Sequence, residues 1–185
     1  MKKEYSNAVL VCIVLLIITL PLPWVIASIF AAIVHEVGHY LVMLVLTGER
    51  AKLSINLFRA TLRMPDISHK EELLCAASGP AAGMLLLLLQ PIFPRLALCA
   101  CVQSAFNLLP IYPLDGGRIL KCLLAMVCKP ARSEQICRIT ANLCKCIVVT
   151  GAIYAFFYYE WGCYTLIAAG IILIRENSPC KLSIL

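Results

Sequence analysis

Long apolar segments separated by short polar connections make up most of the chain. The first uncharged stretch, from Tyr5 to Val34, is too long for one membrane helix. Residues 21–23 read Pro-Leu-Pro and interrupt it, and proline does not continue a helix. We therefore predict a helical hairpin with one span over 5–20 and a second over about 24–46.

Four further apolar segments follow. We predict a third span at about 73–89, a fifth at about 143–159 and a sixth at about 161–174. The fourth segment, about 96–127, is longer and carries polar residues and two prolines in its middle. An irregular backbone at membrane depth is tolerated only where it is buried in protein or lines a wet cavity.

The connection over 47–72 is the longest polar stretch. Its charged residues are Glu49, Arg50, Lys52, Arg59, Arg63, Asp66, Lys70, Glu71 and Glu72. Within it apolar residues alternate with polar ones over 52–58, a period that favours a short strand or hairpin over an interfacial connector. The pattern thus predicts an all-α polytopic membrane protein with about six transmembrane helices and a short β-hairpin-like amphipathic connection after the second.

We treat residues 1–185 as a single membrane-embedded domain, with its core over 24–127. The alternative for the N-terminus is a cleaved signal peptide, since Lys2 and Lys3 precede an apolar core. Cleavage after Ala27 would leave too few residues to hold His35 within a bilayer, so we favour an uncleaved span. With the N-terminus cytoplasmic, the positive-inside rule is satisfied and both termini face the cytosol.

Composition supports a membrane protein and excludes other classes. Apolar residues make up 62% and charged residues 14%, which is too little polar material for a soluble domain. A net charge of +6 would suggest a nucleic-acid partner for a soluble protein, but here the placement of the charges matters more than their sum, and we expect no nucleic-acid partner. Eleven cysteines, an odd number without a C-x-x-C pair, argue against a disulfide framework or a thiolate zinc site.

Residues 35–39 read His-Glu-Val-Gly-His, an H-E-x-x-H motif on a predicted membrane helix. Residues four apart share a helix face, so His35 and His39 can bind one Zn²⁺ while Glu36 reaches a water on the metal. Two histidines and a glutamate inside an apolar span would be costly without a metal, a water cavity or partners. The motif therefore predicts a catalytic zinc site.

A tetrahedral zinc with two histidines and a water lacks one protein ligand. We predict Asp115 for this position, because prolines and glycines on either side should break the helix and turn its carboxylate inward. One Zn²⁺ with two neutral histidines, Asp115 and Glu36 has no net charge, which suits a low-dielectric site. His69 is expected to be a solvated loop residue.

The two motifs, residues 35–39 and Asn107 to Gly117, resemble those of the site-2 proteases, which are intramembrane zinc metalloproteases. A weaker third motif is Ser-Gly-Pro-Ala-Ala-x-Gly from Ser78. The resemblance covers about residues 5–175 and is closest to the compact bacterial branch that processes a sporulation sigma-factor precursor. It implies that Glu36 is catalytic and that one Zn²⁺ per chain is bound by its two neighbouring histidines and the aspartate.

The resemblance gives further expectations. The asparagine matching Asn107 is thought to bind substrate or stabilise the reacting carbonyl, although an interhelical hydrogen bond suits it equally. The small residues from Ser78 onward are expected to let the third span approach the second closely. Arg118 and Lys121 should extend toward the cytosol or pair with acidic groups.

The predicted function is cleavage, by a zinc-activated water, of a membrane-spanning or membrane-tethered regulatory protein, such as a sigma-factor precursor or an anti-sigma factor. An extended substrate would pair with the strand at 52–58. The implied setting is the bacterial cell membrane, with the lipid bilayer and an inhibitory or regulatory membrane protein as partners. The alternatives are a metal-ion transporter and an inactive, substrate-binding relative.

Overall fold

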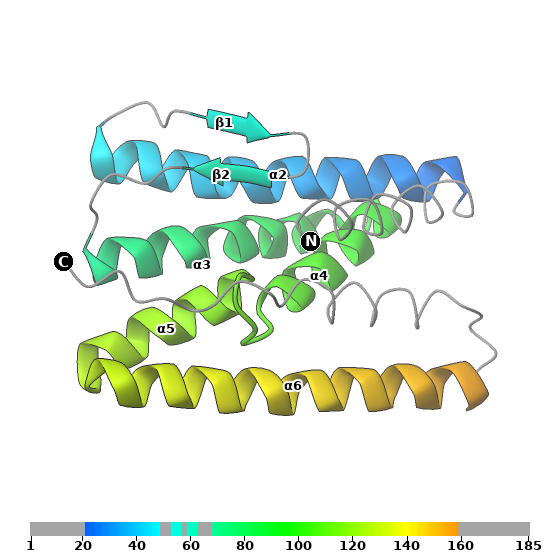
Figure 1. The fold of residues 1–185 in the computed structure, drawn as a ribbon. Helices are drawn as coiled ribbons and strands as arrows, with labels where there is room; N and C mark the ends of the chain where they lie inside the picture. Colours follow the sequence, from blue (N-terminus) through cyan, green and yellow to red (C-terminus); the bar gives the residue numbers. More distant parts are fainter. Residues whose placement is uncertain (1–20, 49–52, 57–58, 63–67, 159–185) are drawn as a thin grey trace.

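The structure is a computed structural model that describes residues 21–48, 53–56, 59–62 and 68–158. The described elements are the helices α2 (Leu22–Thr47), α3 (His69–Leu85), α4 (Pro94–Asn107), α5 (Asp115–Val127) and α6 (Pro130–Tyr158), the short 3₁₀ helix η1 (Leu86–Leu89) and the strands β1 (Leu53–Asn56) and β2 (Arg59–Leu62). The predicted spans at 5–20 and 161–174 lie outside the described residues. Figure 1 shows the helices stacked roughly side by side, with the hairpin next to α2.

Helix α2 corresponds to the second predicted span, and the prediction of a helix over 24–46 is confirmed. Pro21 precedes its first turn, where a missing N–H has no consequence. Gly48 ends it in the left-handed region at a φ of 63° and donates its N–H to the carbonyl of Leu44. A residue without a Cβ adopts this conformation without strain, so the chain leaves the helix here.

Helix α3 begins four residues earlier than the predicted third span. Ser68 caps it: the Ser68 N–H donates to Glu71 at 2.7 Å, and the Glu71 N–H donates back to the Ser68 hydroxyl at 3.4 Å. This capping box adds a polar first turn to an apolar helix. His69, expected in a loop, is therefore the first residue of a helix, although its side chain is exposed as expected.

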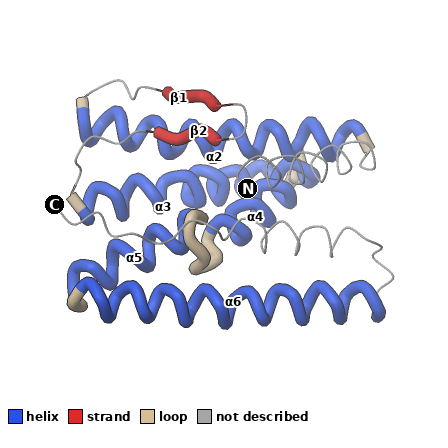
Figure 2. The backbone as a smooth tube through the Cα atoms, in the orientation of Figure 1, coloured by secondary structure: helices blue, strands red, loops and turns tan. Residues whose placement is uncertain are grey.

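The fourth predicted segment is two short helices rather than one span. Helix α4 ends at Asn107, residues 108–114 form an irregular loop, and α5 begins at Asp115. Figure 2 shows this loop between the two helices. The predicted break is therefore present, but it is confined to the proline-containing residues, while Gly116 and Gly117 belong to the first turn of α5.

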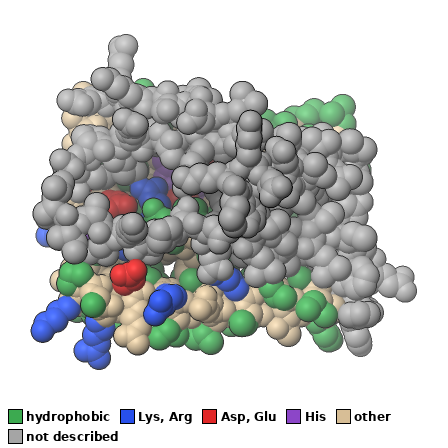
Figure 3. All heavy atoms as spheres, viewed as in Figure 1, with side chains coloured by type: hydrophobic (Ala, Val, Ile, Leu, Met, Phe, Trp, Pro, Cys, Tyr) green, Lys and Arg blue, Asp and Glu red, His purple; other side chains and the backbone are tan. Residues whose placement is uncertain are grey.

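Helix α6 begins at Pro130, well before the predicted start of the fifth span at 143. Proline at a first helical position is favoured, and Arg132 and Arg138 in the following turns are exposed. In Figure 3, Lys and Arg side chains gather over the N-terminal part of α6. The helix thus begins in a charged stretch and continues into an apolar one. A helix start predicted from the first apolar residue misses its charged turns.

Three described helices are long and apolar enough to cross a membrane: Leu22–Thr47, His69–Leu89 and Pro130–Tyr154. Large apolar side chains point outward from them, including Val45, which is 82% exposed. Contacts between helices use small residues instead, such as Ala31 against Ala100. An apolar exterior and small interior contacts are typical of a membrane protein, and this part of the predicted fold class and location is confirmed.

The hairpin follows α2. Strands β1 and β2 pair antiparallel, from Leu53 opposite Leu62 to Asn56 opposite Arg59. It lies within the connection over 47–72, where the alternation placed a strand. In the described residues the sheet has two strands, so each has an outer edge of backbone groups.

Candidate metal centre

The buried face of α2 carries the two histidines. Its buried residues are Ala27, Ala31, His35, His39 and Met43, one at every fourth position. This spacing makes a single stripe along the helix, and α3 and α4 pack against α2. His35 and His39 are therefore held inside the bundle, each residue being at most 5% exposed.

Asp115 reaches the same place from the start of α5. Its position depends on two glycines that let the loop over 108–114 fold tightly against the helix. A Cβ on Gly116 would lie 2.6 Å from the carbonyl oxygen of Leu109, and one on Gly117 would lie 2.5 Å from the backbone nitrogen of Tyr112. Neither contact is possible for a real side chain, so only glycine lets this turn place Asp115 inward.

The three side chains meet at one point. Asp115 Oδ2 lies 3.0 Å from His35 Nε2 and 3.2 Å from His39 Nε2, and the two Nε2 atoms are 3.2 Å apart. Zinc bonds of about 2.0–2.1 Å in a tetrahedron put neighbouring donors about 3.3–3.4 Å apart. The observed triangle is close to this size and offers two nitrogens and one oxygen, a donor set that suits Zn²⁺.

A hydrogen bond at the far side of the ring fixes the orientation of His39. Its Nδ1–H donates to the carbonyl oxygen of Cys75 at 2.7 Å, which leaves a lone pair on Nε2. That lone pair faces the carboxylate oxygen of Asp115 across 3.2 Å. Two such atoms repel each other unless a proton or a cation lies between them, so the residues present fit a bound metal ion.

Two other predicted residues lie around the donor triangle. Asn107, the last residue of α4, is half-buried, and its Nδ2 is 3.3 Å from His35 Nε2. Glu36 follows His35 in α2, and its side chain is exposed rather than part of the triangle. The structure thus brings four of the five predicted residues together and leaves Glu36 on the neighbouring face of α2.

The other carboxylate oxygen of Asp115 faces a cation. Arg118 Nη1 lies 3.8 Å from Asp115 Oδ1, one helical turn further along α5. Arg118 Nε also lies 3.7 Å from Glu72 Oε1 on α3. Pairing of Arg118 with acidic groups was expected, and its contact with Asp115 follows from their three-residue spacing on α5, which the sequence analysis did not use.

Close packing of α2 on α3 supports the histidines, as the small residues predicted. A Cβ on Gly38 would lie 2.7 Å from the Cβ of Ala82 and 2.8 Å from the carbonyl of Ser78. Gly79 faces the imidazole of His39 directly. The carbonyl of Cys75, one helical turn before Gly79, accepts a hydrogen bond from His39 that the sequence analysis did not predict. A backbone acceptor is present at every residue, so the residue type gives no sign of it.

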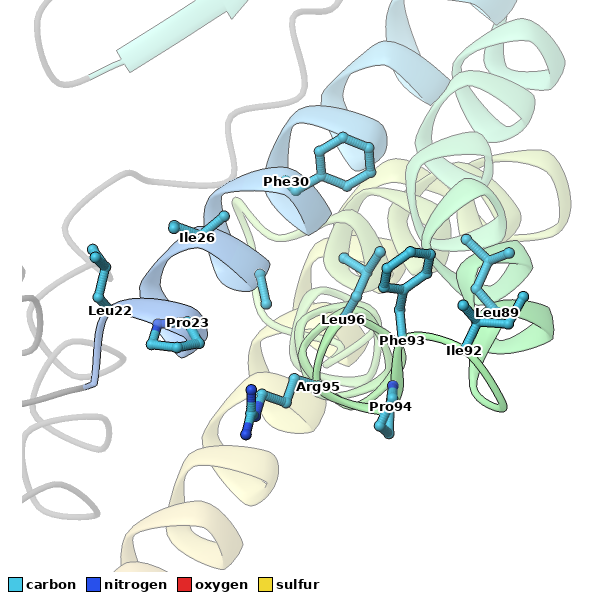
Figure 4. Close-up of a pocket in the computed structure, with 11 residues that line it drawn as sticks. Leu22, Pro23, Ile26, Phe30, Leu89, Ile92, Phe93, Pro94, Arg95 and Leu96 are labelled. Atoms are coloured by element: carbon cyan, nitrogen blue, oxygen red, sulfur yellow. The ribbon is translucent and has the colours of Figure 1, made fainter.

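An apolar cavity of about 820 Å³ lies elsewhere, between the first turns of α2 and the start of α4. Its lining includes Ile26, Phe30, Phe93 and Leu96, and Arg95 stands at its edge (Figure 4). None of the donor residues lines it. The donor triangle and this cavity are thus separate features.

Comparisons with known proteins agree with this geometry. Residues 87–150 match peptidase family M50, a stretch that contains Asn107 and Asp115 but not the two histidines. A zinc metalloprotease of Methanocaldococcus jannaschii is 26% identical over 133 residues, 64% of this chain and 38% of its own. A Synechocystis protein with a zinc-metalloprotease name is 31% identical over 124 residues, 55% of this chain and 33% of its own.

The chain spans about a third of the length of these curated relatives. A solved structure covers it more completely: a site-2 protease from M. jannaschii has a TM-score of 0.62 at 20% identity, over 98% of this chain and 89% of the other. At this identity the likeness concerns the fold. The family match covers Asp115 but not the two histidines, whose place beside Asp115 comes from the structure of this chain.

Proposed function

We propose that the protein is a zinc-dependent intramembrane endopeptidase, a proposal that the match of residues 87–150 to peptidase family M50 supports. The observation that carries the proposal is the approach of His35, His39 and Asp115 to within 3.0–3.2 Å of one another. In the sequence, the two histidines precede the polar connection over 47–72 and Asp115 follows it. Helices that are apolar outside hold them in the interior.

In the proposal, His35, His39 and Asp115 hold one Zn²⁺ and leave its fourth position to water or substrate. When bound there, zinc supplies a Lewis acid that makes a water nucleophilic near neutral pH and polarises a peptide carbonyl. The protein's own contribution is to fix the donors. The Cys75 carbonyl orients one imidazole, and Arg118 lies against the carboxylate oxygen that faces away from the histidines.

Glu36 is the proposed general base and acid. It follows His35 directly, so it stands about 100° around the helix from the ligand face, and its side chain is exposed. In the proposal its carboxylate accepts the proton of the attacking water and passes it to the leaving amine.

Asn107 is the proposed oxyanion donor. Its amide nitrogen already lies beside the donor triangle, 3.3 Å from His35 Nε2. An N–H aimed at the carbonyl oxygen strengthens as negative charge develops there, which lowers the barrier of the attack step. The amide also bridges α4 to α2, so a purely structural variant effect has to be separated from a catalytic one.

The proposed substrate is a membrane-spanning or membrane-tethered regulatory protein, such as a sigma-factor precursor, with sporulation as the setting. A helical peptide hides its carbonyls in hydrogen bonds, so the scissile segment has to become extended. The outer edge of β1 or β2 offers backbone groups for such a segment to pair with. In this proposal the enzyme lies in the bacterial cell membrane with both termini in the cytosol.

The test is Glu36→Gln in the full chain, purified in detergent and incubated with a single-span sigma-factor precursor. Glutamine keeps the size of the side chain but cannot accept the proton, so zinc content should stay unchanged while cleavage falls at least 1000-fold. Glu134→Gln, an exposed position on α6, is the matched control and should cleave normally.

Cleavage by the Glu36→Gln protein at the rate of the unchanged protein would refute the proposed role of Glu36. A metal-ion transporter, which is the competing function, predicts metal flux through vesicles and no proteolysis in either form. Asn107→Asp keeps the size of the side chain but removes its N–H, and Asn107→Ala removes both. At equal zinc content, an oxyanion donor predicts that both variants lose cleavage, whereas a packing role predicts that Asn107→Asp keeps it.

A further inference from the structure

A second group of metal-binding side chains lies between α3 and α5 and shares no donor with the first. It consists of His69, Glu72 and Cys122, whose ligand atoms all lie within 4.8 Å of one another. Cys122 is 1% exposed, Glu72 is half-buried and His69 is exposed. The group therefore reaches from a buried thiol to the surface, which gives an ion a path into it.

Helix geometry explains how the three donors come together. His69 and Glu72 are three residues apart in the first turn of α3, so their side chains share a face. Helix α5 packs against α3 and places the buried thiol of Cys122 on that face. No spacing in the sequence connects Cys122 to the other two. The sequence analysis argued against a thiolate zinc site because no two cysteines are paired, and that argument does not cover a site with a single thiolate.

We propose that His69, Glu72 and Cys122 form a second Zn²⁺ site. An imidazole, a carboxylate and a thiolate are a donor set that Zn²⁺ accepts, while Mg²⁺ and Ca²⁺ prefer oxygen alone. The thiolate, the carboxylate and a neutral imidazole balance the two charges of the ion, which suits a half-buried position. The three protein ligands leave the fourth position for water.

The distances allow this assembly without movement of the helices. Zinc ligands in a tetrahedron are separated by about 3.3–3.8 Å when bonds are about 2.0–2.3 Å. The ligand atoms here all lie within 4.8 Å of one another, so the largest excess over that range is at most about 1 Å. Rotation of the exposed His69 side chain can remove such a difference, because its position on the surface leaves it room.

One cation already stands near the group. Arg118 Nε is 3.7 Å from Glu72 Oε1, beyond the usual range of about 2.7–3.2 Å for a hydrogen bond of this kind. This pair is therefore a weak competitor for a carboxylate that a divalent ion would bind directly. Arg118 also faces Asp115, so an ion on Glu72 would leave Arg118 to that carboxylate and link the two sites electrostatically.

Cobalt(II) distinguishes the sites, because a thiolate bound to Co²⁺ gives a charge-transfer absorption in the near ultraviolet that imidazole and carboxylate do not give. The full chain in detergent, freed of metal by a chelator, is titrated with Co²⁺. We expect two equivalents to bind and the thiolate band to appear. Cys122→Ser should lose the band and one equivalent, while Cys101→Ser, a thiol on α4, should lose neither.

Two further variants complete the test. Asp115→Ala should lose one equivalent and keep the thiolate band, so failure of the first site and failure of the second are read separately. His69→Gln replaces an exposed residue and should weaken the binding that produces the band at least tenfold, even where Cys122→Ser folds poorly.

Absence of a thiolate band from the unchanged protein would overturn the second site. The same conclusion would follow from a band that survives Cys122→Ser, or from one that is as strong and as tightly bound in His69→Gln.

Discussion

His39 shows how single residues define the candidate centre. One ring nitrogen donates to the Cys75 carbonyl at 2.7 Å, and the other faces Asp115 at 3.2 Å. The ring can occupy this position only because Gly79, on the facing helix, has no side chain. The geometry of the donor triangle thus depends on the absence of a Cβ at Gly79 as much as on the ligands themselves.

Gly79→Ala tests this dependence. A Cβ there would lie 2.5 Å from Cε1 and 2.8 Å from Cδ2 of His39, so the imidazole must shift. Removing such support from a metal ligand typically weakens metal affinity about 10- to 100-fold, and we expect a loss of this size in zinc competition with a chelator. Gly151→Ala on α6, where a Cβ meets nothing within 4 Å, should leave affinity unchanged. Equal affinity in both variants would contradict the packing account.

Residue types predicted much of this centre, but not its supports. The histidines and Glu36 are recognisable because the chemistry needs those types at that spacing. Asp115 is recognisable because prolines precede it and glycines follow it. The Cys75 carbonyl and the approach of Asn107 to His35 depend on helix packing, and packing is decided by contacts that no local pattern contains.

At the scale of elements, the short helices α4 and α5 matter more than the long ones. Neither qualifies as a membrane-length helix, and together they place Asn107 and Asp115 beside α2. The loop over 108–114 makes this possible by turning the chain between them inside the bundle. Its contacts with Gly116 and Gly117 fix where α5 begins.

Gly116→Ala should therefore damage both stability and the metal centre. Its Cβ would collide with the carbonyl of Leu108, and overpacking of this kind costs about 1–3 kcal/mol. We expect a lower melting temperature and reduced zinc content together. Gly48→Ala, at a left-handed cap with nothing within 4 Å, should cost about 1–2 kcal/mol and keep its zinc. Full zinc content in Gly116→Ala would show that the loop does not set the position of Asp115.

The hairpin makes a prediction of its own. If substrate pairs with a strand edge, Ile55→Pro, which removes a backbone N–H and disturbs β1, should lower cleavage of a membrane-tethered precursor at least tenfold at unchanged zinc content. Lys70→Ala, in the same connection but on α3, serves as the control. Undiminished cleavage by the Ile55→Pro protein would exclude strand pairing as the means of binding.

Element boundaries show what hydropathy can and cannot predict. The helix over 24–46 was placed within two residues at its start, because both its ends coincide with changes in residue type. The start of α3 was missed by four residues although Ser68 and Glu71 form a recognisable capping box. The start of α6 was missed because its basic first turns do not resemble an apolar span, yet a helix can extend beyond a bilayer.

At the scale of the whole molecule, the fold reverses the arrangement of a soluble protein. Leu and Ile side chains cover the outside of α2 while histidine and aspartate lie within. Polar groups buried this way need partners, and one ion between the three donors would serve all of them at once. The apolar exterior and the buried donor set are thus the two features on which the proposed intramembrane hydrolysis depends.

The most direct measurement is X-ray absorption at the zinc edge on the Cys122→Ser protein, which lacks the proposed second site. We predict one zinc per chain, bound by two imidazole nitrogens and by oxygen at about 2.0–2.2 Å, with no sulfur, and loss of this ion in Asp115→Ala. A zinc with sulfur among its ligands, or one whose surroundings do not change in Asp115→Ala, would contradict a centre shared by α2 and α5.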